Sequence, residues 1–203
     1  MTDAAPATRP VRISTTLTAS IAAAAGSALL ALAAHPIAGT AAYAWLLTAL
    51  LTALLAGAAA APITIDLRSR KLPNRWVAPI ASGAAVQTIS IAYATADPWR
   101  VLWPAITAAV VFGIYVALGL AGMFGFGDAK FAAAMTIIPA IYAGPLALYV
   151  VPIAVLLAGL WRAVLTAAGH GKRPRAHGPA IAIATLVILA TTIALQQAAG
   201  VLQ

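Results

Sequence analysis

The stretch "WRVLWPAITAAVVFGIYVALGLAGM", residues 99–123, decides the fold because its 25 residues carry a single charge, on Arg100. About 20 apolar residues in a helix are enough to cross the hydrocarbon core of a bilayer. Similar runs recur over most of the 203-residue chain, of which 63% is hydrophobic and 8% is charged. Soluble domains carry about a quarter charged residues. The sequence therefore predicts an all-α, polytopic membrane protein.

Polar turns divide the apolar sequence into about seven membrane-spanning helices. Pro73 and Asn74 form a favourable start for the third of them. A cleaved signal sequence at the N-terminus would leave six, although the first run is longer than the usual apolar region of about 7 to 15 residues. We expect a cytoplasmic tail over residues 1–12 and a single membrane domain over residues 13–203. The expected spans are residues 13–34, 41–65, 76–94, 99–123, 128–143, 146–165 and 179–198.

The net charge of +8 is explained by the orientation of the chain in the membrane. Cytoplasmic loops of membrane proteins collect Lys and Arg. With a cytoplasmic N-terminus, seven spans place eleven of the twelve basic residues on the cytoplasmic side and leave Arg100 on the other. A nucleic-acid partner is therefore not expected. The eleven residues are Arg9, Arg12, Arg68, Arg70, Lys71, Arg75, Lys130, Arg162, Lys172, Arg173 and Arg175.

Several kinds of chemistry are excluded by what the sequence lacks. The chain has no cysteine, which rules out disulfides, thiolate nucleophiles and iron–sulfur ligation within it. It also has no GxSxG segment and no HExxH pair, the motifs typical of serine hydrolases and zinc proteases. We expect no cofactor and no metal site.

The four acidic residues can be weighed one by one. Asp3 lies in the polar tail, and Asp97 precedes Pro98 at the expected start of the fourth span, where it would cap the helix. Asp66 and Asp128 differ from these, because each stands at the end of an apolar span. An ionisable side chain in that position is costly and is a functional candidate by default.

Two complete spans separate Asp66 from Asp128, so both are expected on the cytoplasmic side at similar depth. Two neighbouring carboxyl groups can divide the roles of base and acid: one takes a proton from water while the other polarises a scissile carbonyl. The alternative is purely structural. Asp66 would then pair with Arg68 or Arg70, and Asp128 would cap the fifth helix and pair with Lys130.

The helix ends suggest which carboxyl group is the base. Asp128 opens the fifth helix, whose positive end favours the ionised form, whereas Asp66 closes the second helix, whose negative end disfavours it. Asp128 is therefore the expected base and Asp66 the expected acid, although Arg68 and Lys71 act against this assignment at Asp66. The glycines around Gly125 are expected to loosen the chain, so that Asp128 stands free of a helix wall.

Three segments resemble one known family, the prepilin peptidases, which are membrane aspartic proteases that remove leader peptides from type IV pilin-like precursors. "GFGDAKF" (125–131) resembles their GxGD segment, and "IDLRSRKLPN" (65–74) resembles the segment with their first aspartate. "HGPAIAIAT" (177–185) is similar to their C-terminal Gly-Pro segment. The resemblance makes Asp66 and Asp128 the catalytic pair. Its supporting residues would be Gly125, Gly127, Lys130, Pro73 and Asn74.

The departures from the family are also informative. Larger members carry a cysteine-bearing segment and methylate the trimmed pilin, whereas this chain has neither the cysteines nor a loop of that size. It is similar to the short, peptidase-only form found in tight-adherence pilus systems and archaeal preflagellin peptidases. The resemblance implies pilin-like precursors and the lipid bilayer as partners, with cleavage at the cytoplasmic face of the cell membrane. It leaves a homo-oligomer open.

Two other classes of protein remain open from the sequence. One is a small transporter or ion-conducting protein that uses Asp66 and Asp128 as a cation or proton site. The other is a membrane platform whose basic loops dock a cytoplasmic partner. Lys130 would either orient a substrate carbonyl or extend its amine towards water. We expect His35, His170 and His177 to be ordinary polar loop residues, and Trp76, Trp99, Trp103 and Tyr115 to be interfacial or packing aromatics.

Overall fold

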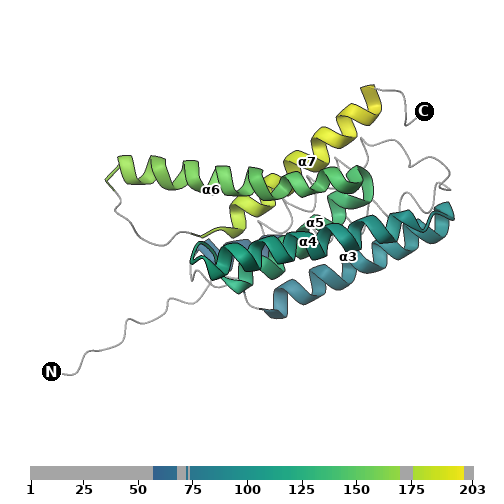
Figure 1. Cartoon of the computed structure of the whole chain (residues 1–203), viewed down its shortest axis with the longest axis horizontal. Coiled ribbons are helices and arrows are strands. Elements are labelled where there is room, and N and C mark those ends of the chain that lie inside the picture. Colours follow the sequence, from purple (N-terminus) through teal and green to yellow (C-terminus); the bar gives the residue numbers. More distant parts are fainter. Residues whose placement is uncertain (1–56, 68–71, 73, 170–175, 199–203) are drawn as a thin grey trace.

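The computed structural model describes residues 57–67, 72, 74–169 and 176–198 (Figure 1). These residues form helices, and no strand occurs among them, as the sequence predicted. A helix over Gly57–Leu67 comes first. The elements that follow it are α3 (Asn74–Thr95), α4 (Trp99–Leu120), α5 (Phe126–Ala143), the 3-10 helix η1 (Gly144–Tyr149), α6 (Val150–Ala167) and α7 (Gly178–Ala198).

Several of these helices are long and apolar enough to cross a membrane. The longest apolar segment covers α5, η1 and α6 with 42 residues, about twice the length that one crossing needs. Figure 1 shows the chain reversing its direction through η1, where Gly144 adopts a φ of 54°. The four candidate spans in the described part of the chain are Trp76–Thr95, Trp99–Leu120, Phe126–Ala167 and Gly178–Leu195.

These segments overlap the predicted third to seventh spans. The predicted first span, residues 13–34, lies outside the described residues, and so does most of the second, residues 41–65. The count of about seven spans therefore stays a prediction. Pro73 also lies outside the described residues, whereas Asn74 is the first residue of α3.

The boundary between α4 and α5 differs from the prediction in a way that matters for the site. The fourth span was expected to reach residue 123, but α4 ends at Leu120 and Gly122 turns the chain with a φ of 77°. Helix α5 then begins at Phe126, since Gly125 takes the position that precedes the helix. Asp128 consequently belongs to the first turn of α5 and does not stand free of it.

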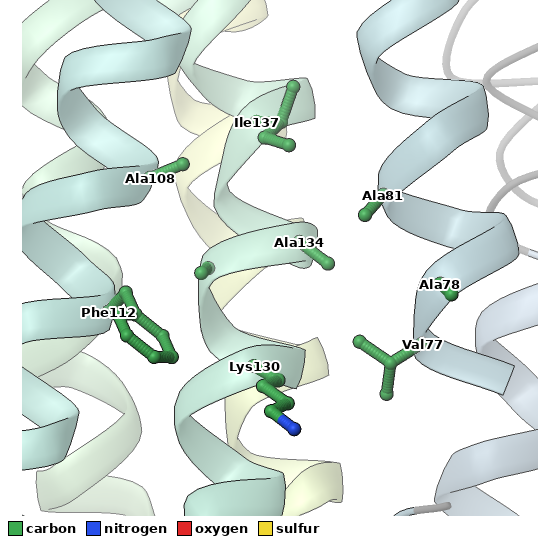
Figure 2. A pocket seen from close by; sticks show the side chains of 9 residues that line it. Val77, Ala78, Ala81, Ala108, Phe112, Lys130, Ala134 and Ile137 are labelled. Carbon is green, nitrogen blue, oxygen red and sulfur yellow. The ribbon is translucent and has the colours of Figure 1, made fainter. Parts of the chain in front are cut away.

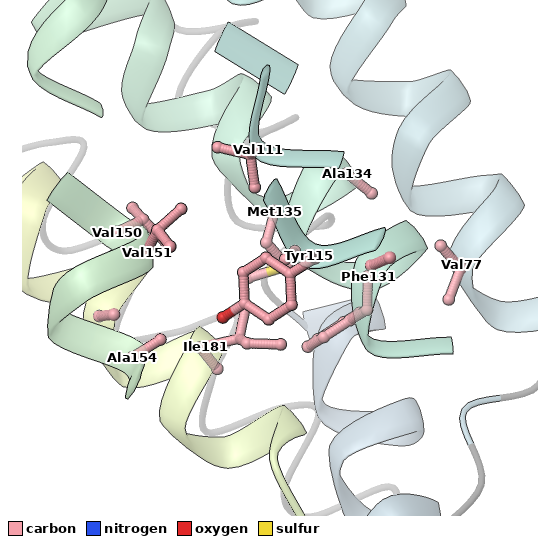
Figure 3. Close-up of a cluster of buried hydrophobic side chains, with 14 of the residues drawn as sticks. Val77, Val111, Tyr115, Phe131, Ala134, Met135, Val150, Val151, Ala154 and Ile181 are labelled. Atoms are coloured by element: carbon pink, nitrogen blue, oxygen red, sulfur yellow. The ribbon is translucent and has the colours of Figure 1, made fainter. Parts of the chain in front are cut away.

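Helix α5 forms the centre of the bundle and packs against α3, α4, α7 and η1. Its alanines allow the neighbouring backbones to approach closely, as is common between helices in lipid. Figure 3 shows Tyr115 of α4 at the middle of the buried cluster, with Phe131 and Met135 of α5 and Ile181 of α7 around it. The core thus joins the helices that carry Asp128, Tyr115 and the start of α7.

The outer surfaces of the bundle, which face away from this core, are also apolar. Helix α6 exposes Leu156, Leu160 and Trp161, which need no protein cover when lipid surrounds the helix. Trp99 and Trp103 stack on each other near the start of α4 with ring centroids 5.9 Å apart. Both are exposed, in agreement with the expected interfacial position.

Gly127 offers a test of how closely α5 is packed. A Cβ atom at this position would lie 3.2 Å from Leu72 Cβ and 3.3 Å from Leu72 O. We predict that Gly127→Val lowers the free energy of unfolding by about 1–3 kcal/mol through overpacking, measured as a lower melting temperature in detergent. Gly113→Val is the control, because a Cβ at Gly113 meets nothing within 4 Å. Equal melting temperatures for the two variants would contradict the packing argument.

Candidate active site

One end of the bundle collects the residues singled out from the sequence. The helix over Gly57–Leu67 and α4 both end there, while α5 and α7 both begin there (Figure 1). Asp66 is the penultimate residue of its helix, and Asp128 is the third residue of α5. The structure therefore places both carboxyl groups at the same end, as the alternation of spans predicted.

Asp66 is buried, with 4% of its surface exposed. The backbone N–H of Gly178, the first residue of α7, donates a hydrogen bond of 2.8 Å to Asp66 Oδ2. A Cβ atom on Gly178 would lie 3.0 Å from that same oxygen, so a side chain here would displace the carboxyl group. The contact explains why glycine stands at the start of α7. The predicted pairing with Arg68 or Arg70 falls on residues outside the described part.

Asp128 is half-buried in the first turn of α5. Its Oδ2 accepts a 3.0 Å hydrogen bond from the backbone N–H of Gly125, the residue directly before the helix, which is the backward half of a capping box. The capping part of the structural alternative is thus present. It does not remove Asp128 from the site, since the first turn of α5 still lies at the same end of the bundle as the helix end that carries Asp66.

The glycines of the GxGD segment have more specific roles than general flexibility. Gly125 supplies the N–H that holds Asp128. Gly127 lets α5 approach Leu72, six residues after Asp66. The first motif and the second motif are therefore in direct contact, because a side chain at Gly127 would collide with the segment that follows Asp66.

The helix ends do not separate the two carboxyl groups as clearly as the sequence predicted. Asp128 lies at the N-terminus of its own helix, α5. Asp66 lies at the C-terminus of its own helix but also receives the N–H of Gly178 from the N-terminus of α7. Both carboxyl groups thus face a positive helix end, and Asp66 differs from Asp128 in having less of its surface exposed.

Sequence reasoning missed His177, which was expected to be an ordinary loop residue. It does precede α7, yet only 4% of its surface is exposed. Its Nε2 lies 2.9 Å from the Tyr115 hydroxyl in a hydrogen bond, and its ring stacks on Phe124 with centroids 4.1 Å apart. Burial lowers the pKa of His177 to about 4, so the ring is neutral at pH 7. His35 and His170 lie outside the described residues.

Tyr115 is likewise more than a packing residue. Its ring is fully buried in α4, and its hydroxyl is the partner of His177. A tyrosine hydroxyl buried within an apolar span needs such a partner, which is the signal that could have pointed to this contact. Tyr115, Phe124 and His177 together form a three-ring group, called here the aromatic cluster.

Lys130 lies away from the two carboxyl groups. Two residues along a helix correspond to about 200° of rotation, which turns Lys130 from the side of Asp128 towards α3 and α4. There it lines an apolar groove of about 430 Å³ between these helices. Figure 2 shows its amine at one end of the groove, with Val77 and Phe112 on either side. This position favours extension of the amine towards water over a role beside the carboxyl groups.

The proximity of Asp66 and Asp128 can be tested without activity, because the chain has no cysteine. We predict that Asp66→Cys with Asp128→Cys is cross-linked efficiently by a short bifunctional thiol reagent in membranes. A protease then cuts the loops between the two positions. Fragments that still migrate together on a denaturing gel report the cross-link. Asp97→Cys with Asp128→Cys is the control, since Asp97 precedes the opposite end of α4. Equal yields for both pairs would contradict the shared site.

The neutral state of His177 predicts a dependence of stability on pH. Its pKa is about 6.5 in the unfolded chain and about 4 in the fold, so the unfolded chain binds the proton first. The stability is present above pH 6.5 and is lost as the pH falls towards 4. We expect the melting temperature of His177→Phe to fall less over this range than that of the wild type. Tyr115→Phe keeps the imidazole and should retain the wild-type slope; identical slopes in all three would contradict the assignment.

Comparison with known proteins identifies the family of the chain. The model of the type IV leader peptidase family matches residues 53–167, more than half of the chain. This match contains Asp66 and Asp128 and ends before His177. No curated protein and no solved structure matches the chain. The family resemblance noted from the sequence is confirmed, and the chain belongs to the type IV leader peptidase family, as a membrane-embedded peptidase.

Proposed function

We propose that this chain is an aspartic endopeptidase that uses Asp66 and Asp128 to remove leader peptides from type IV pilin-like precursors. One observation carries the proposal. Two carboxyl groups, the acids of two distant sequence motifs, lie at one end of an apolar bundle, Asp66 in the last turn of its helix and Asp128 in the first turn of α5. Each is held by the backbone N–H of a glycine, Gly178 for Asp66 and Gly125 for Asp128. Such an arrangement suits a pair that must divide the roles of acid and base.

The difference in burial supports a division of roles. Asp128 keeps more of its surface exposed than Asp66, and we assign it as the base that takes a proton from the attacking water molecule. Asp66 is buried, which favours its neutral form, and it gives its proton to the scissile carbonyl oxygen. Water adds to the carbonyl carbon to form a tetrahedral diol, which collapses when the amide nitrogen receives a proton. No covalent enzyme intermediate forms.

The position of the site at helix ends supports a substrate that is itself anchored in the membrane. The precursor's apolar segment lies against the bundle, and its short basic leader stays in the cytoplasm. The scissile bond then meets the carboxyl groups at the membrane surface. This orientation follows the basic residues of the loops, which the positive-inside rule assigns to the cytoplasm. The absence of cysteine in the chain favours the peptidase-only form.

The transporter alternative is supported less well by the same geometry. Cation and proton sites of transporters lie near the middle of the bilayer on broken helices. Among the described residues, Asp66 and Asp128 occupy helix ends on one side. The platform alternative would leave both residues replaceable, which does not agree with a carboxyl group buried against the start of α7.

We predict that Asp66→Asn and Asp128→Asn each lower precursor cleavage by roughly a thousandfold, because each removes one proton-transfer group. The chain is co-expressed with a panel of pilin-like precursors, and the loss of the leader is followed as a fall in precursor mass. The melting temperature of each variant is measured in parallel.

Asp97→Asn is the matched control for these variants. Asp97 accepts a hydrogen bond from the N–H of Trp99 and pairs with Arg100 at the far end of α4, about 30 Å from the site. Cleavage by this variant should equal that of the wild type. Intact precursors across the whole panel, or full cleavage by Asp66→Asn, would reject the peptidase mechanism; the first result would favour the transporter.

A further inference from the structure

The backbone groups that hold the two carboxyl groups share one feature. Each follows an aromatic residue directly in the sequence: Gly178 comes after His177, and Gly125 comes after Phe124. The rings of His177 and Phe124 stack on each other with centroids 4.1 Å apart and planes 23° apart. The residues that precede the two hydrogen-bond donors are therefore in direct contact.

A second contact fixes the orientation of this stack. The Tyr115 hydroxyl lies 2.9 Å from His177 Nε2, and the Tyr115 ring packs against Phe124 with centroids 5.4 Å apart. The torsion that turns a histidine ring has broad minima, so the hydrogen bond is what holds the ring plane against Phe124. The aromatic cluster thereby joins α4, the link from α4 to α5, and the residue before α7.

The backbone of His177 transmits the position of its ring to α7. Its carbonyl oxygen accepts the N–H groups of Ala180 and Ile181 at 3.0 and 3.2 Å, which begins the helix. The next residue, Gly178, donates to Asp66. A shift of the ring therefore moves the start of α7 and the donor together.

We propose that His177 is a positioning residue, whose stack on Phe124 and hydrogen bond to Tyr115 hold the Gly178 and Gly125 donors, and with them Asp66 and Asp128, at the separation that the reaction requires. This inference rests on the proposed function. It assigns a role to three residues that touch neither substrate nor water in the mechanism. Catalytic groups lose up to about a hundredfold in rate when they are misplaced by about 1 Å.

The experiment uses the full-length membrane protein and a precursor that the wild type cleaves. Tyr115→Phe removes one hydroxyl and keeps the ring, so the bundle is expected to fold. Its kcat should fall by about tenfold while KM stays unchanged, since the separation of the carboxyl groups changes and the substrate contacts do not. Tyr149→Phe is the matched control, because it removes the same hydroxyl from an exposed residue of η1, 58% accessible, at the opposite end of α5. It should retain the wild-type kcat.

A double-variant cycle separates positioning from general stability. His177→Phe keeps a ring on Phe124 and loses the hydrogen bond, so it should lower kcat as Tyr115→Phe does. The two changes together should lower kcat no further than either alone, because they break the same contact. Additive losses, or a KM that rises while kcat is retained, would overturn the inference. So would a wild-type kcat in Tyr115→Phe when the wild type and Tyr149→Phe both cleave.

Failure of the proposed function has a different signature. In that case the wild type itself leaves every precursor intact, and the inference falls with it. Activity is expressed per folded protein, with the folded fraction taken from the melting curve of each variant. A loss that follows the folded fraction alone would count against positioning.

Discussion

The burial of one carboxyl group is the constraint on which this end of the bundle depends. Asp66 is enclosed by apolar helices, where a carboxyl group without a hydrogen-bond partner would be costly. The N–H of Gly178 meets this cost, but only if α7 begins at that point and the residue facing Asp66 has no side chain. That single contact determines how α7 is directed and why glycine stands at its start. It also explains why His177, the residue before that glycine, is buried.

Helix α5 completes the arrangement from the other side. The backbone N–H of Gly125, directly before α5, holds the carboxyl group of Asp128 in the first turn of the helix. Gly127, the second residue of α5, lets the helix approach Leu72, which follows Asp66 closely in the sequence. Because the same helix is also the centre of the core, the carboxyl group is held by the most extensively packed element of the bundle. The core of the bundle therefore anchors the helix whose first turn carries Asp128.

The two acids of the site and their shared end of the bundle could be predicted from the sequence, because charged residues are rare in it. Asp66 and Asp128 were identified since each interrupts the end of an apolar run, and counting the spans between them placed both at one end. Gly125 was identified as a supporting residue, but the hydrogen bonds that Gly125 and Gly178 donate could not be predicted, because their functional group is a backbone N–H that every residue but proline carries. His177 was misjudged for a related reason: a polar residue beside a loop is usually solvated, and only the fold brings Tyr115 and Phe124 to its ring. The helix-end argument also failed in part, as it considered each acid within its own helix and could not include α7.

The contact between Asp66 and Gly178 also has a consequence in time. The two residues are 112 positions apart in the chain, which corresponds to roughly 6 to 22 seconds of synthesis at about 5–20 residues per second. Asp128 is made partway through that interval, and from then until Gly178 appears the nascent chain contains both acids but not the segment that completes the surroundings of Asp66. Insertion of α7 is thus the step that turns a set of apolar hairpins into a finished site, so that a hydrolase assembled among other nascent membrane proteins gains its full geometry only after α7 has been made.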